Sequence, residues 1–347
     1  MRTTHGIRVR AGWRVVLTAC TVAATLALAA CGEDESETAG GGGGADAGGQ
    51  EVTKIAFFGF AKANSFAQAT WAGIQEQAQK EGIEAEQFDP NFDAAKQVSQ
   101  IQNAITSGEF QAFIVQANDG NAVVPPIREA LEEGITVVAE FTPVGTRYDT
   151  IEPQVEGLYF VGEAPTQNGT ALGEAGVAAC KGIDPCQVAY LEGFKSLPLD
   201  NARTEAVKAA LAAEPTIELV ASVEGGYTQA SGLKAAQNVL QGNPDVDVMI
   251  GSSQAIAGAE QAVNDAGTKV KLIGNGGSRQ AIDAVREGRW FATYAIPEKS
   301  AGAKAAELAI QAARGEDAPP SFDTRTLLDD PILTKDNVGD IEGEYDE

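Results

Sequence analysis

Short apolar runs and helical patterns alternate along most of this chain, and glycines stand at many of the boundaries between them. Strands that alternate with helices in this way form parallel sheets whose two faces are both covered by helices. The alternation therefore predicts an α/β fold built on a doubly wound parallel sheet. The first apolar runs are 54–60, 83–88, 110–116 and 135–141, and the helical patterns between them are 66–81, 93–107 and 122–133.

The same order of elements returns in the second half of the chain. From Arg203 the pattern is again helix, strand, loop, helix ending at glycine, strand, loop, helix and strand, as it is from Trp71. We interpret this repeat as two doubly wound lobes of similar topology. Ligands of such sheets bind beyond the carboxyl ends of the strands, so two facing lobes form a cleft. The loops predicted to line it are 61–66, 117–121, 141–145, 194–203, 252–254, 275–279 and 296–300.

The start of the chain has the layout of an export signal. Residues 1–14 contain four arginines and no acidic residue, and 15–30 are uncharged, mostly apolar and shorter than a membrane-spanning helix. This run ends in LAAC, which resembles the bacterial lipobox, whose cysteine is lipidated. We predict a lipoprotein signal over 1–30, lipidation of Cys31, and a flexible acidic and glycine-rich tether over 31–50. An ordinary signal peptide with an incidental cysteine is the alternative.

Charge and histidine content disfavour several classes of function. The chain carries 25 Lys and Arg against 49 Asp and Glu, and this net charge of −24 disfavours binding to nucleic acid or anionic lipid. The single histidine, His5, lies in the predicted signal, which leaves the mature protein without a histidine-based catalytic arrangement or zinc site. Outside the cytoplasm, the neighbouring Cys180 and Cys186 are expected to form a disulfide rather than a metal site.

Three segments carry a resemblance to a known family. They are KIAFFGFAKANSFAQATWAGIQEQAQKEGIEA (54–85), NGGSRQAIDAVREGRWFATYAIPEKSAGAKAAELAIQAARGE (275–316) and LLDDPILTKDNV (327–338). Together with the order of elements over about 54–338, they resemble the periplasmic sugar-binding proteins of ABC importers, the ribose-binding-protein-like class. No single segment is decisive, and the order and spacing along the whole chain carry the match.

The resemblance implies a particular division of the chain. A first lobe would comprise 51–160 with 298–322, and a second lobe 161–297 with 323–347. The chain would cross between them three times, near Phe160–Glu163, near Pro297 and near Phe322–Thr324. Closure of the lobes around a ligand would be a hinge motion, and a membrane permease would recognise the closed form.

The resemblance also implies which residues contact a ligand. Asn64 and Phe66 match an amide that hydrogen-bonds a sugar and an aromatic ring that stacks on it. Arg203 matches an arginine that donates to ligand oxygens, and Tyr227 matches an aromatic position of the second lobe. The alternatives are a helix-capping Asn64, a core Phe66, a surface Arg203, and a Tyr227 that packs under a loop.

Other positions depart from the family's polar pattern. Sugar binders often have an Asp-Arg pair directly after the fourth strand, and in this chain Phe141 stands at the first of those two positions. The family's second-lobe Asn falls on Ser252, its Asp falls beside Asn275, and its late Gln falls close to Tyr294. These four residues are the remaining candidate ligand contacts. Because fewer of the family's ligand-contact positions hold polar side chains here, the ligand is expected to have fewer hydroxyls than a pentose or hexose, to be aromatic, or to be a modified sugar.

These expectations describe an exported, non-enzymatic lipoprotein anchored to the outer face of the cell membrane. It would act as a monomer without metal or cofactor, capture a small sugar, polyol or related ligand, and deliver it to an ABC permease. One alternative is a sensor that presents a signal such as an autoinducer to a membrane partner. Another is an exported glycosidase, for which no facing carboxylate pair is evident in the loops. A lactose-repressor-like regulator would need a DNA-reading module where the signal and tether stand.

Overall fold

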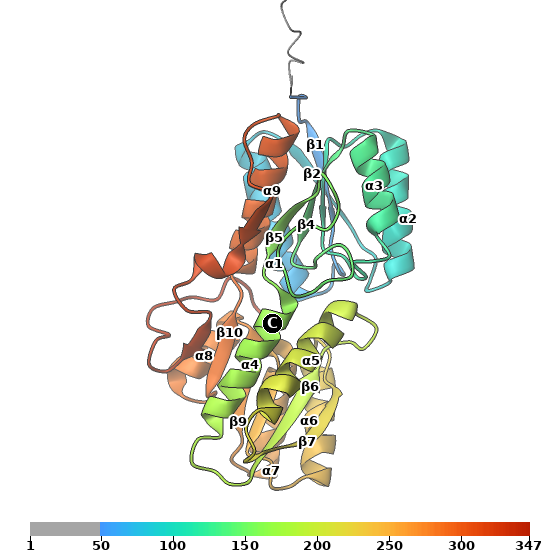
Figure 1. Cartoon of the computed structure of the whole chain (residues 1–347). Coiled ribbons are helices and arrows are strands. Elements are labelled where there is room, and N and C mark those ends of the chain that lie inside the picture. The colour runs from blue at the N-terminus through green and yellow to red at the C-terminus, as the bar shows by residue number, and fades with distance from the viewer. Residues whose placement is uncertain (1–48) are drawn as a thin grey trace, which may run out of the picture. The chain divides into compact units, whose positions relative to one another are not determined.

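The computed structural model describes residues 49–347 of the protein. The predicted signal over 1–30, Cys31 and nearly all of the predicted tether lie outside the described residues. Within 49–347 the chain forms two α/β lobes, each with a central sheet between layers of helices (Figure 1). The α/β fold with two doubly wound lobes, predicted from the alternation, is confirmed. No helix in this range is long and apolar enough to cross a membrane.

The first lobe contains a fully parallel sheet of six strands in the order β11-β5-β4-β3-β1-β2. Helices α1 and α9 pack against each other on one face, and α2 and α3 cover the other. The strands are β1 (Lys54–Phe58), β2 (Glu84–Phe88), β3 (Ala112–Val115), β4 (Thr136–Glu140), β5 (Tyr159–Gly162) and β11 (Ser321–Asp323). The helices are α1 (Ser65–Lys80), α2 (Ala94–Ser107), α3 (Val124–Glu132) and α9 (Glu298–Ala313).

The second lobe repeats this plan with strand order β12-β10-β9-β8-β6-β7, in which only β12 is antiparallel to its neighbour. Helices α6 and α7 pack together over one face of the sheet, and α4 and α5 pack together over the other. The strands are β6 (Cys186–Glu192), β7 (Ile217–Glu224), β8 (Val248–Ser252), β9 (Lys271–Gly276), β10 (Ala292–Ala295) and β12 (Ile332–Thr334). The helices are α4 (Pro165–Ala179), α5 (Pro198–Ala212), α6 (Gln229–Gly242), α7 (Ser253–Ala266), α8 (Arg279–Glu287) and the short 3₁₀ helix η1 (Thr324–Leu327).

Local sequence signals set the ends of many helices. The side chains of Asn64, Asp93 and Ser278 accept hydrogen bonds from backbone N–H groups of the first turns of α1, α2 and α8. Gly108 and Gly267 end α2 and α7 in the left-handed conformation, with φ of 66° at each, which glycine adopts without a steric penalty. These two helices therefore stop at glycines that the sequence pattern marked.

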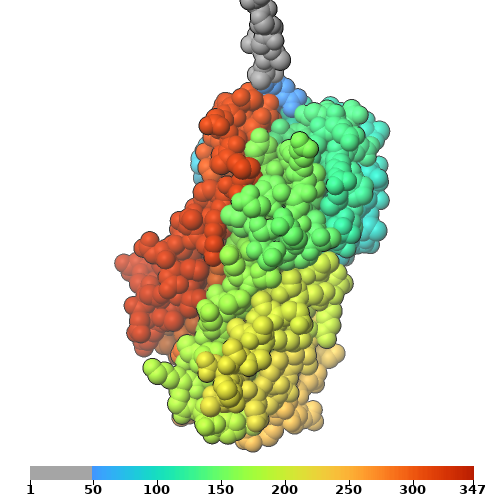
Figure 2. Space-filling model, in the orientation of Figure 1, coloured from blue at the N-terminus to red at the C-terminus, as the bar shows by residue number. Residues whose placement is uncertain are grey.

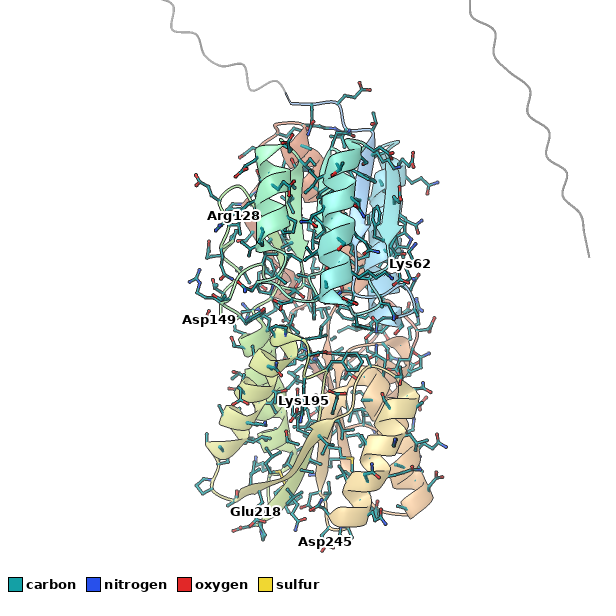
Figure 3. The ribbon with its side chains drawn as sticks, turned by 90° about the vertical axis from the view of Figure 1, so that its right-hand side faces the viewer. Lys62, Arg128, Asp149, Lys195, Glu218 and Asp245 are labelled. Atoms are coloured by element: carbon teal, nitrogen blue, oxygen red, sulfur yellow. A yellow bond between two sulfur atoms is a disulfide. The ribbon has the colours of Figure 1, made fainter. Side chains whose placement is uncertain are left out.

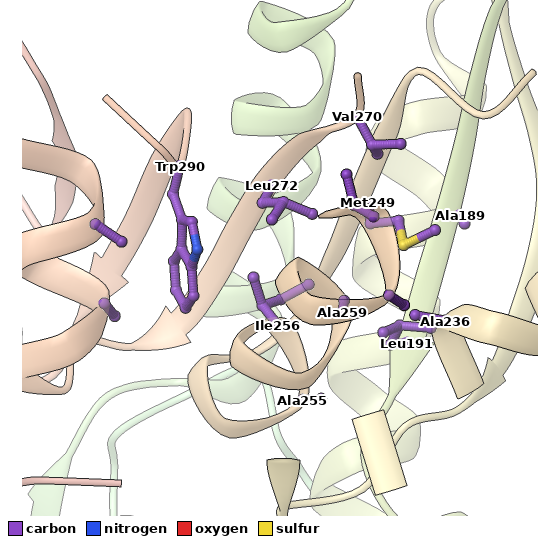
Figure 4. Packing of buried hydrophobic residues seen from close by; sticks show 14 of the residues in the cluster. Ala189, Leu191, Ala236, Met249, Ala255, Ile256, Ala259, Val270, Leu272 and Trp290 are labelled. Atoms are coloured by element: carbon purple, nitrogen blue, oxygen red, sulfur yellow. The ribbon is translucent and has the colours of Figure 1, made fainter. Parts of the chain in front are cut away.

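Buried aliphatic and aromatic side chains fill both lobes. In the second lobe, Trp290, Leu272, Met249 and Ile256 belong to one cluster beneath α6, α7 and α8 (Figure 4). On the opposite face of that sheet, Cys180 and Cys186 form a disulfide that links the C-cap of α4 to the first residue of β6. Each sheet thus has a continuous apolar layer on both faces, as a doubly wound fold requires.

The chain crosses between the two sheets three times. It leaves the first lobe between β5 and α4, returns between β10 and α9, and leaves again between β11 and β12. The two lobes meet along the junction that these crossings span (Figure 2). Glu218 and Asp245, at the amino ends of second-lobe strands, lie far from this junction (Figure 3). The carboxyl ends of the strands are therefore directed toward it.

Candidate ligand-binding cavity

A cavity lies between the lobes, at the carboxyl ends of the strands. The empty space in this cavity, including the part that is open to solvent, is about 540 Å³. Loops of both lobes contribute side chains, as expected for facing doubly wound sheets. Its wall consists of Phe60, Asn64, Phe66, Phe92, Ala117, Asn118, Phe141, Leu197, Leu199, Asp200, Arg203, Tyr227, Gln254, Asn275, Gly276 and Ile296.

Aromatic rings of the first lobe form one side of the cavity. Phe141 follows the last residue of β4, and its ring makes edge contacts with Phe66 and Phe60 at centroid distances of 4.9 and 6.0 Å. Its backbone φ of 61° lies in the left-handed region, which bulky side chains rarely adopt. Residues held in such conformations often mark binding sites, because the surrounding structure must over-determine them.

Aromatic contacts also join the two lobes across the cavity. Phe92, in the loop between β2 and α2, lies 5.2 Å from Phe194 and 6.4 Å from Tyr227 between ring centroids. Gln254 at the start of α7 donates through Nε2 to Ser65 Oγ at 3.2 Å, and this bond also joins the lobes. The structure therefore holds the lobes in contact around the cavity.

A buried polar network on α5 forms the opposite side. Asp200 and Arg203, three residues apart on one helix face, form an ion pair in which Arg203 Nη1 donates to Asp200 Oδ1 at 2.9 Å. Tyr227 Oη and the backbone N–H of Phe194 also donate to the Asp200 carboxylate, at 2.5 and 2.8 Å. Burial, followed by the negative charge of Asp200, raises the pKa of Tyr227 well above its usual range, so its hydroxyl stays a donor.

Asparagine side chains extend this network, and three of them, Asn64, Asn118 and Asn275, belong to the cavity wall. Arg203 Nε donates to Asn168 Oδ1 at 2.6 Å, and Asn168 and Asn275 exchange two amide hydrogen bonds of 3.0 and 3.2 Å. Asn64 caps α1 through its Oδ1, which accepts from the N–H of Ala67 at 3.0 Å. By contrast, Asn118 is only 2% exposed, and neither its Oδ1 nor its Nδ2 has a hydrogen-bond partner within the described residues.

The structure brings six of the eight sequence-predicted contact residues to the cavity wall. They are Asn64, Phe66, Phe141, Arg203, Tyr227 and Asn275. For Asn64 the capping alternative also holds, because its oxygen caps the helix while the residue faces the cavity. Arg203 is 5% exposed, which excludes the surface alternative.

The other two predicted contact residues, Ser252 and Tyr294, are not among the residues of the cavity wall. Ser252 Oγ donates to the carbonyl of Gly226 at 2.8 Å and accepts from the N–H of Ala255, so its side chain is used as the N-cap of α7. Tyr294 is 1% exposed, and its hydroxyl donates to the carboxylate of Glu163 behind the cavity. Matching positions along a strand does not show which of its two faces points to the ligand.

Sequence reasoning did not single out several wall residues. Asn118 lies in the loop 117–121 that was expected to line the cleft, but nothing in the sequence distinguishes it from its neighbours. The sequence did contain a signal for Asp200, because a carboxylate three residues before Arg203 on a helix lies on the same helix face and can pair with it. Phe92 had none, because its contact depends on the approach of the other lobe.

Two buried acidic sites lie beneath the cavity, near the interlobe crossings. Glu163 follows β5 and is 3% exposed, and burial raises its pKa to about 7 against the opposing effect of the Tyr294 hydrogen bond. Glu140 and Glu298 are both fully buried, and Glu298 begins α9 directly after the second crossing. Burial raises the pKa of Glu140 to about 8 and that of Glu298 well above its usual range. These carboxyls are therefore held in their protonated form to higher pH than usual.

The wall of this cavity offers groups that can bind a ligand by stacking and by hydrogen bonding. In residues 49–347 no group of three or more His, Cys, Asp or Glu side chains is placed to hold a metal ion. The acid in the wall, Asp200, is fully engaged by Arg203, Tyr227 and a backbone N–H. Aromatic faces for stacking and amides for hydrogen bonding remain available to a ligand.

The amino-acid sequence of this chain is similar to those of known binding proteins. A family model described as a periplasmic binding protein domain matches residues 55–317. The ribose import binding protein of Bacillus subtilis is 24% identical over 254 residues, which cover 73% of this chain and 79% of that protein. The ribose import binding protein of Escherichia coli is 26% identical over 258 residues, which cover 73% of this chain and 82% of that protein.

Solved structures show the same fold. An ABC transporter solute binding protein from Mycobacterium smegmatis, with bound glycerol, is 25% identical with a TM-score of 0.72 and covers 86% of this chain and 100% of its own. The Caulobacter myo-inositol binding protein, bound to myo-inositol, is 21% identical with a TM-score of 0.72 and covers 82% of this chain and 94% of its own.

Proposed function

Because this chain belongs to the periplasmic binding protein domain family, we propose that it is the solute-binding component of an ABC importer for a small sugar or polyol. It captures the ligand between its two lobes and presents the closed form to a membrane permease. The observation that carries this proposal is the cavity itself, which is walled by aromatic rings from one lobe and by buried polar groups from the other.

The cavity suits a hydroxylated ring for a physical reason. The C–H face of a sugar is apolar and packs on aromatic rings, while its hydroxyls need both donors and acceptors, which neutral amides supply. The ribose import binding proteins among the relatives and the glycerol and myo-inositol complexes among the structures bind ligands of this kind, according to their names. No covalent step is required for this role, so we assign no enzymatic activity to the chain.

Lipid anchoring at Cys31 forms part of the same proposal. A lipid on this cysteine would keep the protein at the outer face of the membrane, and residues 32–50 would let it reorient between solute and permease. Mass spectrometry of the mature protein is expected to find a diacylated N-terminal Cys31. Release of a Cys31→Ser variant from the membrane fraction would support the anchor, and equal retention of that variant would contradict it.

The central test is ligand binding by the purified protein. A panel of pentoses, hexoses, deoxy sugars, methyl glycosides and polyols is screened by thermal shift, and hits are measured by isothermal titration calorimetry. A ligand at 100 times its Kd adds about 2.7 kcal/mol of stability, so a true ligand is easily seen. Arg203→Ala should abolish the hit, and the exposed Glu205→Gln on the same helix should not. Absence of any sugar or polyol hit would contradict the proposal.

A further inference from the structure

The wall of the cavity is dominated by apolar side chains. Phe60, Phe66, Phe92 and Phe141 come from the first lobe, and Leu197 and Leu199 come from the second. Rings and aliphatic chains offer no partner to a hydroxyl that points at them. A ligand group that rests on these surfaces is therefore favoured when it is a hydrogen, a methyl or another apolar group.

The charged groups of the wall are already matched within the protein. The Asp200 carboxylate accepts three hydrogen bonds, and Arg203 donates to Asp200 and to Asn168. Because the two opposite charges are paired at 2.9 Å, the cavity presents no unmatched charge to a ligand. An ionised ligand would lose its hydration without gaining a counter-charge, so the ligand is expected to be neutral.

Two of the three asparagines in the wall already use their amide oxygens within the protein. The oxygens of Asn64 and Asn275 already accept from Ala67 and Asn168. Asn118 differs, since both ends of its buried amide are without a partner in the described part of the chain. A buried amide in this state points to a ligand that both donates to its Oδ1 and accepts from its Nδ2.

We propose that the ligand is an uncharged sugar ring in which at least one hydroxyl is replaced by hydrogen, methyl or O-methyl, and that Asn118 binds its remaining hydroxylated edge. This inference rests on the proposed function, because it names the class of sugar for the same cavity. The substituted edge packs against Phe141, where a fully hydroxylated sugar would leave a hydroxyl without a partner. Each such orphan hydroxyl lowers affinity by roughly tenfold.

The backbone at Phe141 supports this assignment. Its φ of 61° is a conformation in which asparagine and aspartate are the favoured residues other than glycine. The chain nevertheless holds a phenylalanine there, wedged against Phe66 and 5.8 Å from the Arg203 guanidinium. An apolar ring at a position where a short polar residue would be less strained indicates selection for an apolar ligand surface.

Matched ligand pairs test the inference on the purified full chain. Calorimetry compares D-galactose with its terminal-deoxy form D-fucose, L-mannose with L-rhamnose, D-glucose with methyl glucoside, and myo-inositol with its O-methyl ether. In every pair that binds, the less hydroxylated member is expected to bind at least about tenfold more tightly. Equal or tighter binding of the fully hydroxylated members overturns the inference while the proposed function stands. Failure of every pair to bind removes the proposed function and the inference together.

Two variants test the assigned residues. Phe141→Asn suits the left-handed backbone and supplies a polar partner, so the preference within a pair should fall by roughly tenfold. Asn118→Ala should weaken both members of a pair by about tenfold, whereas Asn121→Ala, exposed in the same loop, should change neither. The melting temperature of each variant shows that it is folded. An unchanged preference in Phe141→Asn, or unchanged affinity in Asn118→Ala, contradicts the assignment.

Discussion

At the scale of single residues, two strained aromatic positions stand out. Phe92 and Phe141 both have φ near 60°, and both rings face the cavity. Phe141 contacts rings of its own lobe, whereas Phe92 reaches Phe194 and Tyr227 of the other lobe. Phe141 therefore packs within the cavity wall of its own lobe, whereas Phe92 adds an aromatic contact between the lobes.

Replacement of Phe92 by alanine is expected to weaken ligand binding by about five- to tenfold. Aromatic pairs contribute about 0.5–1.5 kcal/mol beyond the area they bury, and this contribution is made only when the lobes are closed. The unfolding temperature of the ligand-free protein should change little, because Phe92 lies in a loop outside the hydrophobic core clusters of both lobes. Calorimetry with a ligand from the panel measures the effect, and Leu327→Ala on the surface is the control. A fall in stability without a loss of affinity would assign Phe92 to folding instead.

At the scale of elements, α5 carries the charged pair of the cavity. Asp200 and Arg203 lie on its buried face, while Glu205, with a side chain 78% exposed, lies on its outer face. A buried ion pair is strongly destabilised when one partner is removed, since the other charge is left uncompensated. The helix is thus a structural support of the second lobe as well as a wall of the cavity.

Asp200→Asn is expected to lower the free energy of unfolding by roughly 3 kcal/mol, because it leaves Arg203 buried without its counter-charge. Glu205→Gln on the same helix is the matched control and should change it by less than about 0.5 kcal/mol. Urea unfolding followed by circular dichroism measures both. If Asp200→Asn were as stable as the control, the pair would be a ligand-binding device without a structural role.

The elements themselves were largely predictable, and the partners of individual side chains were not. The strand at 54–60 and the helix at 66–81 correspond to β1 and α1 because local periodicity and Gly82 specify them. Ser252 and Tyr294 were predicted as ligand contacts because they match, or lie next to, polar positions of the resembled family, but a position along a strand does not show which face of the strand meets the cavity. Asn118 was missed because an unpartnered amide is a property of the assembled lobes, not of a short sequence.

At the scale of the whole molecule, two buried acids stand close to an interlobe crossing and to the cavity wall. Glu140 directly precedes Phe141, and Glu298 follows Pro297 at the return crossing. Thr70 and Gln116 donate to Glu298 Oε1 at 2.5 and 3.0 Å, and within the described chain no Lys or Arg forms an ion pair with either acid. With no cation to offset their charge, the folded state binds protons more strongly here than the unfolded state.

Stability is therefore expected to fall as the pH rises. The folded pKa of Glu140, about 8, exceeds its ordinary value of 4.5, so its contribution is complete below that ordinary value and is lost as pH rises through about 8. Glu140→Gln keeps the shape and removes the titration, which should flatten the decline between about pH 5 and 8. Urea midpoints across this range measure it, with the exposed Glu205→Gln as control. An equally steep decline in Glu140→Gln would place the responsible group elsewhere, with Glu163 the next candidate.

The C-terminal residues 343–347 contact both lobes, which makes them a fourth link beside the three crossings. On α9 of the first lobe, the N–H of Ser300 donates to Glu344 at 2.8 Å. In the second lobe, the N–H of Arg279 donates to the carbonyl of Tyr345 at 2.9 Å, and Ser278 Oγ donates to Glu347. The ring of Tyr345 also lies 6.0 Å from that of Phe66 in the cavity wall. Opening of the lobes must therefore break one set of these contacts.

Removal of residues 344–347 is expected to favour the open form while both sheets remain folded, because none of these residues belongs to a strand. The apparent Kd rises in inverse proportion to the fraction of closed protein, so a shift of about 1.4 kcal/mol toward the open form weakens binding roughly tenfold. Small-angle scattering of the ligand-free protein should show a larger radius of gyration, and calorimetry should show the weaker binding. Glu344→Gln, which retains the tail but weakens its bonds to Ser300, should lie between the two proteins. Unchanged scattering and affinity after the truncation would mean that the three crossings alone set the balance between open and closed forms.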